Sequence, residues 1–292
     1  MWPRVEEKAA IAILWAAATI SILTTIAIVF TLLRESLTFF EDVPVWEFLG
    51  GTKWTPLFKP QSFGVLPLVS GTLLVTAIAG ITSLTFGLGA AIYLSEYAPD
   101  RLRRVIKPIL EVLAGIPTVV YGFFALIVVT PVIRWIFPDA NIFNALSAGL
   151  VMGLMIMPMV STLSEDAMVA VPRTLRDGAY ALGATRYEVA IKIVVPAALP
   201  GIMAALILAL SRAIGETMIV TIAAGATPNM TFSPLESIQA MTSYIVQVNQ
   251  GESPQGSVIF KTIFAVGLLL FLTTLAMNIA GQWVIKRFRN QY

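Results

Sequence analysis

The side chains best suited to binding a charged ligand are Arg212 and Glu216, which interrupt an apolar stretch over residues 199–226. An arginine within a membrane-spanning helix costs roughly 2.5 to 3.5 kcal/mol, so its side chain is expected to face a water-filled path or the protein interior. Guanidinium donors match the oxygens of an oxyanion such as phosphate. We therefore predict that Arg212, Glu216 and Thr217 line a substrate pathway.

Two interpretations of the charged pair are open. Glu216 follows Arg212 by four residues, which places both side chains on one face of a continuous helix. In the first, Glu216 pairs with Arg212 while the path is empty, limits anion leak, and releases it when an anion arrives. In the second, the residues form a permanent ion pair that only packs helices. The order Arg before Glu is the weaker one for a helical pair, which disfavours the second interpretation.

The composition excludes several kinds of chemistry. The chain has no cysteine and no histidine, which rules out thiolate nucleophiles, disulfides, Cys/His metal sites and imidazole triads. No G-x-x-x-x-G-K-[ST] loop is present to bind nucleotide phosphates. The net charge of +2 comes without a basic patch for nucleic acid. Only Arg212 and Glu216 lie deep in a span, which is too few residues for an intramembrane active site, so the chain is expected to be non-catalytic and to hold no metal or cofactor of its own.

The hydropathy indicates an all-α integral membrane protein. Hydrophobic residues make up 57% of the 292 residues, charged ones 12%, and the mean hydropathy is +0.83. Six apolar stretches are long enough to cross about 30 Å of hydrocarbon as helices. They cover residues 9–33, 68–95, 105–137, 141–163, 199–226 and 258–285. The first exceeds the apolar core of a cleavable signal peptide and is expected to remain as a helix.

The positions of the basic residues predict the orientation. With both termini in the cytoplasm, 13 of the 19 Lys and Arg residues fall on the inside, 5 outside and 1 within the fifth span. Two long loops, residues 34–67 and 227–257, then face outward. We expect the aromatic residues of the first to rest at the membrane interface, with docking of an external partner as the alternative. They are Trp46, Phe48, Trp54 and Phe58.

The inside loop after the fourth span is predicted to form two short helices that meet at Gly183 and Ala184. Thr174 with Asp177, and Thr185 with Glu188, have the spacing of capping boxes that begin helices. Glycine tolerates positive φ, so Gly183 suits the end of the first helix. Such a corner projects beyond the membrane and can be held rigidly, as mechanical coupling requires.

This loop carries a family pattern. Asp177-Gly178-Ala179, then Gly183 and Ile193, then Val195-Pro196 resemble the E-A-A-x3-G-x9-I-x-L-P loop of ABC-importer permeases. The departures are Asp for Glu, Gly for the first Ala and Val for Leu. The resemblance implies a MetI-like, type I permease fold. It also implies that an ATPase subunit contacts Asp177, Gly178, Ala179, Leu182, Gly183 and Ala184.

A finer resemblance covers residues 63–225. Strings at 94–99, 114–122, 164–167, 181–186 and 212–217 resemble the permeases of the phosphate-specific transport (Pst) system, of the PstC type rather than the PstA type. This implies inward phosphate transport in the cell inner membrane, with ATP and magnesium bound elsewhere. The implied partners are a PstA-like permease, two PstB-like ATP-binding subunits and a PstS-like phosphate-binding protein. A permease for sulfate, molybdate or phosphonate, and an ATP-independent secondary transporter, are the alternatives.

The remaining expectations concern organisation. Residues 1–67 should form the first span and an external loop, 68–285 the permease core with a coupling loop at 164–198, and 286–292 a basic cytoplasmic tail.

Gly115, Pro117 and Gly122 are candidates for a gating hinge, because proline kinks or breaks helices. Lys107 and Glu111 are expected to pair along one helix. Small residues between Gly80 and Gly89 are expected to allow close helix packing.

Overall fold

The computed structural model describes residues 2–251, 254 and 256–288. Within these, the chain is helical, with one isolated bridge between Trp54 and Phe63 and no strand. The predicted all-α class is therefore confirmed. Residues 289–292 of the expected basic tail lie outside the described residues, and residues 286–288 end the last helix.

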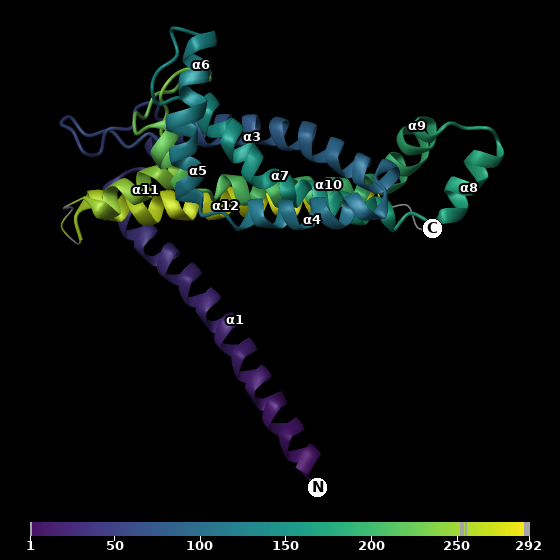
Figure 1. The fold of residues 1–292 in the computed structure, drawn as a ribbon. Helices are drawn as coiled ribbons and strands as arrows, with labels where there is room; N and C mark the ends of the chain where they lie inside the picture. Colours follow the sequence, from purple (N-terminus) through teal and green to yellow (C-terminus); the bar gives the residue numbers. More distant parts are fainter. Residues whose placement is uncertain (1, 252–253, 255, 289–292) are drawn as a thin grey trace.

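The helical elements carry the labels of Figure 1. In the first half they are α1 (Trp2–Asp42), α2 (Val45–Gly50), α3 (Leu66–Ile92), η1 (Tyr93–Tyr97), α4 (Asp100–Gly115), α5 (Thr118–Phe124), η2 (Ala125–Val129) and α6 (Thr130–Ile136). In the second half they are α7 (Ala145–Val169), α8 (Arg173–Ala181), α9 (Arg186–Glu188), η3 (Val189–Val194), α10 (Val195–Ile214), η4 (Val220–Ala224), α11 (Met241–Gln250) and α12 (Val258–Phe288). The η elements are π-helical turns that continue a neighbouring helix.

Six helical segments in the described part of the chain are long and apolar enough to cross a membrane, which confirms the predicted number. They are Glu7–Asp42, Leu66–Tyr97, Thr118–Ile136, Ala145–Val169, Arg186–Ile214 and Val258–Arg287. The expected bounds are wrong for two of them. The third stretch breaks at Ile116 and Pro117, which confirms the kink or break expected at this proline, and α4 is therefore a separate helix. The fifth begins earlier than residue 199 and ends at Ile214.

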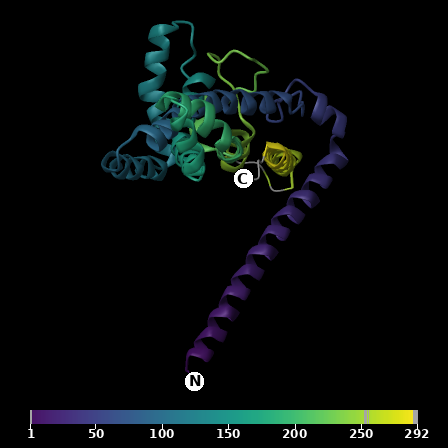
Figure 2. The same cartoon turned by 90° about the vertical axis from the view of Figure 1, so that its right-hand side faces the viewer.

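The body of the molecule is a group of packed helices from which α1 departs. In it α3 packs on α7, α7 on α10, and α10 on α12. α1 touches α12, and its N-terminal end extends far from the body in both ribbon views (Figures 1 and 2). No residue in the most apolar window of this described helix is buried.

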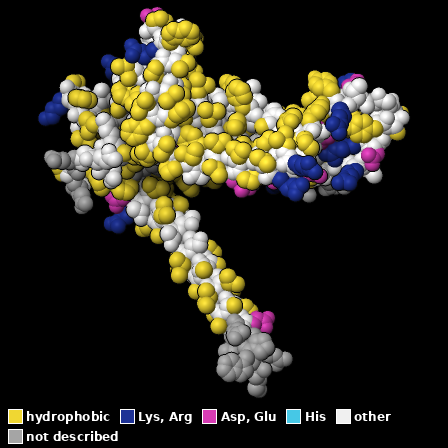
Figure 3. All heavy atoms as spheres, in the orientation of Figure 1, with side chains coloured by type: hydrophobic (Ala, Val, Ile, Leu, Met, Phe, Trp, Pro, Cys, Tyr) yellow, Lys and Arg dark blue, Asp and Glu magenta, His cyan; other side chains and the backbone are white. Residues whose placement is uncertain are grey.

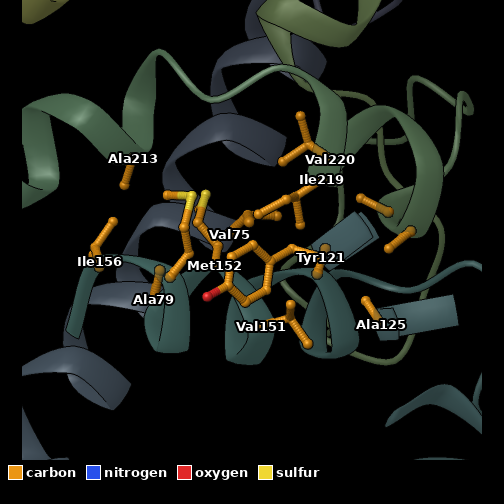
Figure 4. Close-up of a cluster of buried hydrophobic side chains, with 14 of the residues drawn as sticks. Val75, Ala79, Tyr121, Ala125, Val151, Met152, Ile156, Ala213, Ile219 and Val220 are labelled. Atoms are coloured by element: carbon orange, nitrogen blue, oxygen red, sulfur yellow. The ribbon is translucent and has the colours of Figure 1, made fainter. Parts of the chain in front are cut away.

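The apolar core lies where α3, α5, α7 and η4 meet (Figure 4). Figure 4 shows Val75 of α3, Tyr121 of α5, Met152 of α7 and Ile219 pointing toward one another. The Tyr121 hydroxyl group donates a hydrogen bond of 2.7 Å to the carbonyl oxygen of Leu113 in α4. This bond satisfies the one polar atom that the ring brings into the core.

Small residues allow the helices to approach closely. A Cβ atom added at Gly80 would lie 2.8 Å from Leu210 of α10, and one at Gly87 would lie 3.1 Å from Val160 of α7. The predicted packing role is confirmed at these two positions. At Gly89 the corresponding space is open, so that residue has no such role. The same close approach occurs from the other side, where Gly153 of α7 faces Thr82 of α3.

The first long loop folds back on the helices. Phe48 and Trp54 are buried in an apolar cluster with Phe39 of α1 and Tyr244 of α11. The interfacial role expected for these two residues is therefore wrong, because they join α1 to α11 as core residues. Trp46 and Phe58 remain exposed. The second long loop contains the helix α11, Met241–Gln250.

Candidate functional site

The first candidate site lies where the fifth apolar stretch breaks. α10 ends at Ile214, Gly215 to Thr217 are not helical, and the helix resumes at Met218 and continues into η4. The sequence prediction of a continuous helix is wrong here. In a membrane, irregular backbone is tolerated only where it is buried in protein or lines a water-filled cavity. In a membrane, the break must therefore be covered by protein or face a water-filled cavity.

Glu216 begins the helix that follows the break. Its side-chain Oε1 accepts hydrogen bonds from the backbone N–H groups of Met218, at 3.0 Å, and Ile219, at 3.4 Å. Its backbone carbonyl accepts a bond of 2.7 Å from the Thr242 hydroxyl group of α11. The expected pairing with Arg212 on one helical face is wrong in this structure, because the carboxylate satisfies backbone donors that the break leaves open.

Arg212 occupies the last turn of α10, where a positive charge also interacts favourably with the helix dipole. The side chain is exposed and forms no ion pair or hydrogen bond with the described residues. The neighbouring Thr217 hydroxyl group donates to the Gly215 carbonyl oxygen at 3.3 Å. The structure thus brings Arg212, Glu216 and Thr217 to one break while leaving the guanidinium free for another partner.

The second candidate site is the corner formed by residues 170–185, which we call the α8 corner. α8 projects from one end of the molecule, beyond α7 and η3 (Figure 1). Gly183 has a φ of +82°, and Thr185 and Glu188 form a complete capping box. Both predictions are confirmed. α7 extends to Val169, so the expected loop at 164–198 is helical at both of its ends.

The first predicted capping box is wrong. α8 starts at Arg173, its N-cap is Pro172, and no side chain caps it. The ring of Pro172 fixes its φ near −55°, and with a ψ of 135° this residue is extended, so the first helical residue is Arg173. Along α8 and the turn after it, Ala179 and Ala184 pack against an apolar cluster, whereas Asp177 and Gly178 are exposed. Leu182 is 91% exposed at the tip, where it offers an apolar anchor to a partner.

A group of charged residues joins the α8 corner to the membrane helices, and the spacing of these residues along the chain predicts none of its pairs. We call it the charged cluster: Glu96, Arg103, Lys107, Glu165, Asp166 and Arg176. Lys107 contacts Glu165 at 3.1 Å and Asp166 at 3.6 Å, so its expected pairing with Glu111 is wrong. Figure 3 shows basic side chains gathered at this end. In the sequence, the sign of this cluster was that Ser95-Glu96 and Glu165-Asp166 belong to strings that carry the family resemblance.

The hinge candidates lie around the break between α4 and α5. Pro117 is the N-cap of α5, and Gly115 ends α4 with open space around it. A Cβ atom at Gly122 would lie 2.9 Å from Ile222 of η4, so this glycine packs α5 against the segment that follows Glu216. The structure places a break here, and its movement remains a prediction.

The fold and these two sites define a multi-pass membrane permease subunit. Residues 83–290 match the family model described as "Binding-protein-dependent transport system inner membrane component", and the chain belongs to this family. Its members are non-catalytic membrane subunits that work with ATP-binding subunits and a substrate-binding protein. The non-enzymatic role predicted for the chain is confirmed by this membership.

Two relatives align over most of the chain. It is 35% identical over 277 residues to a probable ABC transporter permease protein, YqgH, of Bacillus subtilis, covering 94% of this chain and 89% of that one. It is 32% identical over 264 residues to the phosphate transport system permease protein PstC of Mesorhizobium japonicum, covering 83% and 79%.

Solved structures share the fold at low sequence identity. The MetNI methionine ABC transporter in an inward-facing conformation matches with a TM-score of 0.60 and 19% identity, over 77% of this chain and 96% of that one. A bacterial alginate ABC transporter in complex with its periplasmic protein matches with a TM-score of 0.64 and 16% identity, over 94% of both chains. The MetI-like, type I fold is confirmed.

Proposed function

We propose that this chain is a PstC-like permease subunit that carries inorganic phosphate inward. Relatives named as phosphate transport permeases at 32 to 33% identity support this substrate. The observation that carries the proposal is the exposed guanidinium of Arg212 at a break in a membrane helix. A planar, permanently charged donor group suits a phosphate oxyanion, and the irregular backbone suits a path that holds water.

The same proposal assigns the partners. A PstA-like permease would complete the pathway, and a PstS-like protein would deliver phosphate from outside. Two PstB-like subunits would bind ATP and magnesium, since this chain has no nucleotide-binding loop. One of them would contact the α8 corner through Asp177, Gly178, Ala179, Leu182, Gly183 and Ala184. Both termini would then lie in the cytoplasm of a cell whose inner membrane holds the complex.

The structure changes the proposed part played by Glu216. Its carboxylate is engaged with Met218 and Ile219, so Arg212 does not depend on it for a resting partner. We infer that Glu216 shapes the break and that Arg212 contacts the anion. Thr217, next to Glu216, would add a hydroxyl group to the same wall.

Transport by the reconstituted complex tests this function. We expect binding-protein-dependent uptake of labelled phosphate in preference to sulfate, molybdate and phosphonate. Arg212→Ala should reduce uptake by about tenfold or more, because it removes the charge that contacts the anion. Arg134→Ala is the matched control, since Arg134 also lies exposed in the last turn of a helix, α6. Near-normal uptake by an assembled Arg212→Ala complex would contradict the pathway role, and preferred uptake of another oxyanion would contradict the substrate.

A further inference from the structure

The α8 corner is attached to the membrane helices by one arginine with several partners. Arg176 Nη2 contacts Glu96 Oε1 at 3.0 Å, and the same nitrogen donates to the carbonyl oxygen of Met168 at 2.8 Å. Its Nη1 donates to the carbonyl oxygen of Val171 at 2.6 Å. The Arg176 side chain is 15% exposed and that of Glu96 is 8% exposed. The guanidinium is therefore largely withdrawn from solvent and held from two directions.

The partners of Arg176 belong to the ends of two membrane-spanning segments. Glu96 lies in η1, which continues α3, and the Ser95 hydroxyl group donates to its Oε1 at 2.8 Å. Met168 lies in the last turn of α7 and Val171 lies two residues after its end, where carbonyl oxygens are open to side-chain donors. Arg176 therefore links α8 to the ends of the second and fourth spans through one rigid, forked group.

Further charged residues extend this connection to α4. Arg103 of α4 donates to the carbonyl oxygen of Leu94 at 2.6 Å and contacts Glu165 Oε1 of α7 at 3.1 Å. Lys107 contacts the other Glu165 oxygen at 3.1 Å, and the Glu165 side chain is only 1% exposed. The charged cluster contains three cationic and three acidic side chains, so its charges balance.

The two faces of α8 are held differently: one by apolar packing, and the face toward η1 by a polar contact. Leu175 and Ala179 pack against the cluster built from α3, α7, η3 and α10, on one face of the corner. The face toward η1 and α4 instead borders a cavity of about 300 Å³, lined by Glu96, Arg103, Arg176 and Tyr180 among others. Beside that cavity, the ion pair between Arg176 and Glu96 joins α8 to η1.

We propose that Arg176 is a positioning residue that transmits movement of the α8 corner to the ends of α3 and α7, with Glu96 as its anchor. The proposal rests on the proposed function, because the movement would come from an ATP-binding subunit docked on the corner. An arginine that bridges Glu96 and two carbonyl oxygens transmits displacement in a defined direction. Without Arg176, the α8 corner could still bind the ATP-binding subunit, but α3 and α7 would no longer follow the movement of the corner.

The test compares ATP hydrolysis with transport in the reconstituted complex. Arg176→Met keeps the length of the side chain and removes its charge and its donors. We expect the complex to assemble and hydrolyse ATP, while the number of anions imported per ATP falls by about tenfold or more. Arg176→Lys should give an intermediate ratio, since one ammonium group cannot reproduce the fork. Arg101→Met, a solvent-facing change on α4, is the control and should keep the wild-type ratio.

A chemical rescue separates transmission from general loss of structure. The chain has no cysteine, so Glu96→Cys combined with Arg176→Cys places two unique thiols at the contact. In a complex whose other subunits lack reactive cysteines, a short bis-methanethiosulfonate reagent forms a disulfide with each thiol and releases methanesulfinate. This cross-link should raise the lowered import ratio, and a dithiol reductant, which cleaves both disulfides, should reverse the gain. Assembly is measured by co-purification. If Arg176→Met does not assemble, Glu96→Gln provides the same measurement with one charge removed.

The ratio is measured with whichever anion the wild-type complex imports, so an error in the proposed substrate leaves this test intact. A wild-type ratio in assembled Arg176→Met or Glu96→Gln complexes would overturn the proposal. An equal loss of ATP hydrolysis and import, with no response to cross-linking, would also overturn it, because that outcome describes a defect in assembly or docking.

Discussion

At the scale of single residues, Glu216 shows how a local backbone feature redirects a charged side chain. Four-residue spacing favours an Arg-Glu pair only while the helix continues between them. Here α10 ends at Ile214, and the carboxylate instead accepts from two backbone N–H groups of the next helix. Those donors would otherwise lack partners in a membrane interior, where each unsatisfied group is costly.

This assignment predicts that Arg212 and Glu216 act independently on stability. Glu216→Ala should lower the stability of the purified complex by about 0.5 to 2 kcal/mol, the usual effect of losing a helix cap. Glu216→Asp, which keeps an acceptor, should lose less. In a double-mutant cycle of Glu216→Ala and Arg212→Ala, measured by thermal unfolding, the coupling energy should stay below about 0.5 kcal/mol. A larger coupling energy would restore the original pairing hypothesis.

At the scale of elements, the α8 corner depends on one left-handed residue. Gly183 has a φ of +82°, and no neighbouring atom would contact a Cβ there. Gly183→Ala should therefore destabilise the corner by about 1 to 2 kcal/mol through backbone strain alone. Gly178→Ala is the matched change, because Gly178 lies in the middle of α8 with equally open space. It should be neutral or stabilising, by up to about 1 kcal/mol.

The rate of backbone hydrogen exchange over residues 173–188 compares the local stability of the α8 corner in the two variants. Faster exchange in Gly183→Ala and equal or slower exchange in Gly178→Ala is the expected result. Equal exchange in both variants would mean that the corner does not depend on the conformation of Gly183.

The contact between α3 and α7 gives a second prediction at this scale. A Cβ atom at Gly153 would lie 2.5 Å from the Cβ of Thr82, which is closer than packed side chains allow. Gly153→Ala should therefore separate the two helices and cost about 1 to 3 kcal/mol, as other overpacked cores do. Gly89→Ala in α3 meets open space and should leave stability unchanged. Thermal unfolding of the two purified variants makes the comparison, and equal stability would contradict the packing assignment.

At the scale of the whole molecule, the distribution of basic residues predicts which end faces the cytoplasm. The absence of cysteine makes single-cysteine labelling direct. Leu182→Cys at the tip of the corner should react with an impermeant thiol reagent only from the cytoplasmic side. Phe58→Cys, at an exposed position of the first long loop, should react only from outside. The reverse pattern would overturn the proposed orientation and the docking of an ATP-binding subunit.

How much the sequence predicts differs between these scales. Apolar length determines whether a segment can cross a bilayer, so the six spans were predictable. Gly183 and the capping box at Thr185 were predictable as well, because both depend on neighbours within a few residues. The start of α8 was predicted at least one residue too late, because the helix begins directly after the extended Pro172 and Thr174 is already inside it.

The tertiary structure alone decided which charges meet. Arg176 contacts Glu96, which lies 80 positions away in the chain, and Lys107 pairs with Glu165 rather than with Glu111, four positions away. Phe48 and Trp54 likewise became core residues because α11, far along the chain, covers them. Sequence periodicity describes neighbours along a helix. The partner of a side chain that leaves its helix depends on how separate helices pack, and that packing exists only in the folded chain.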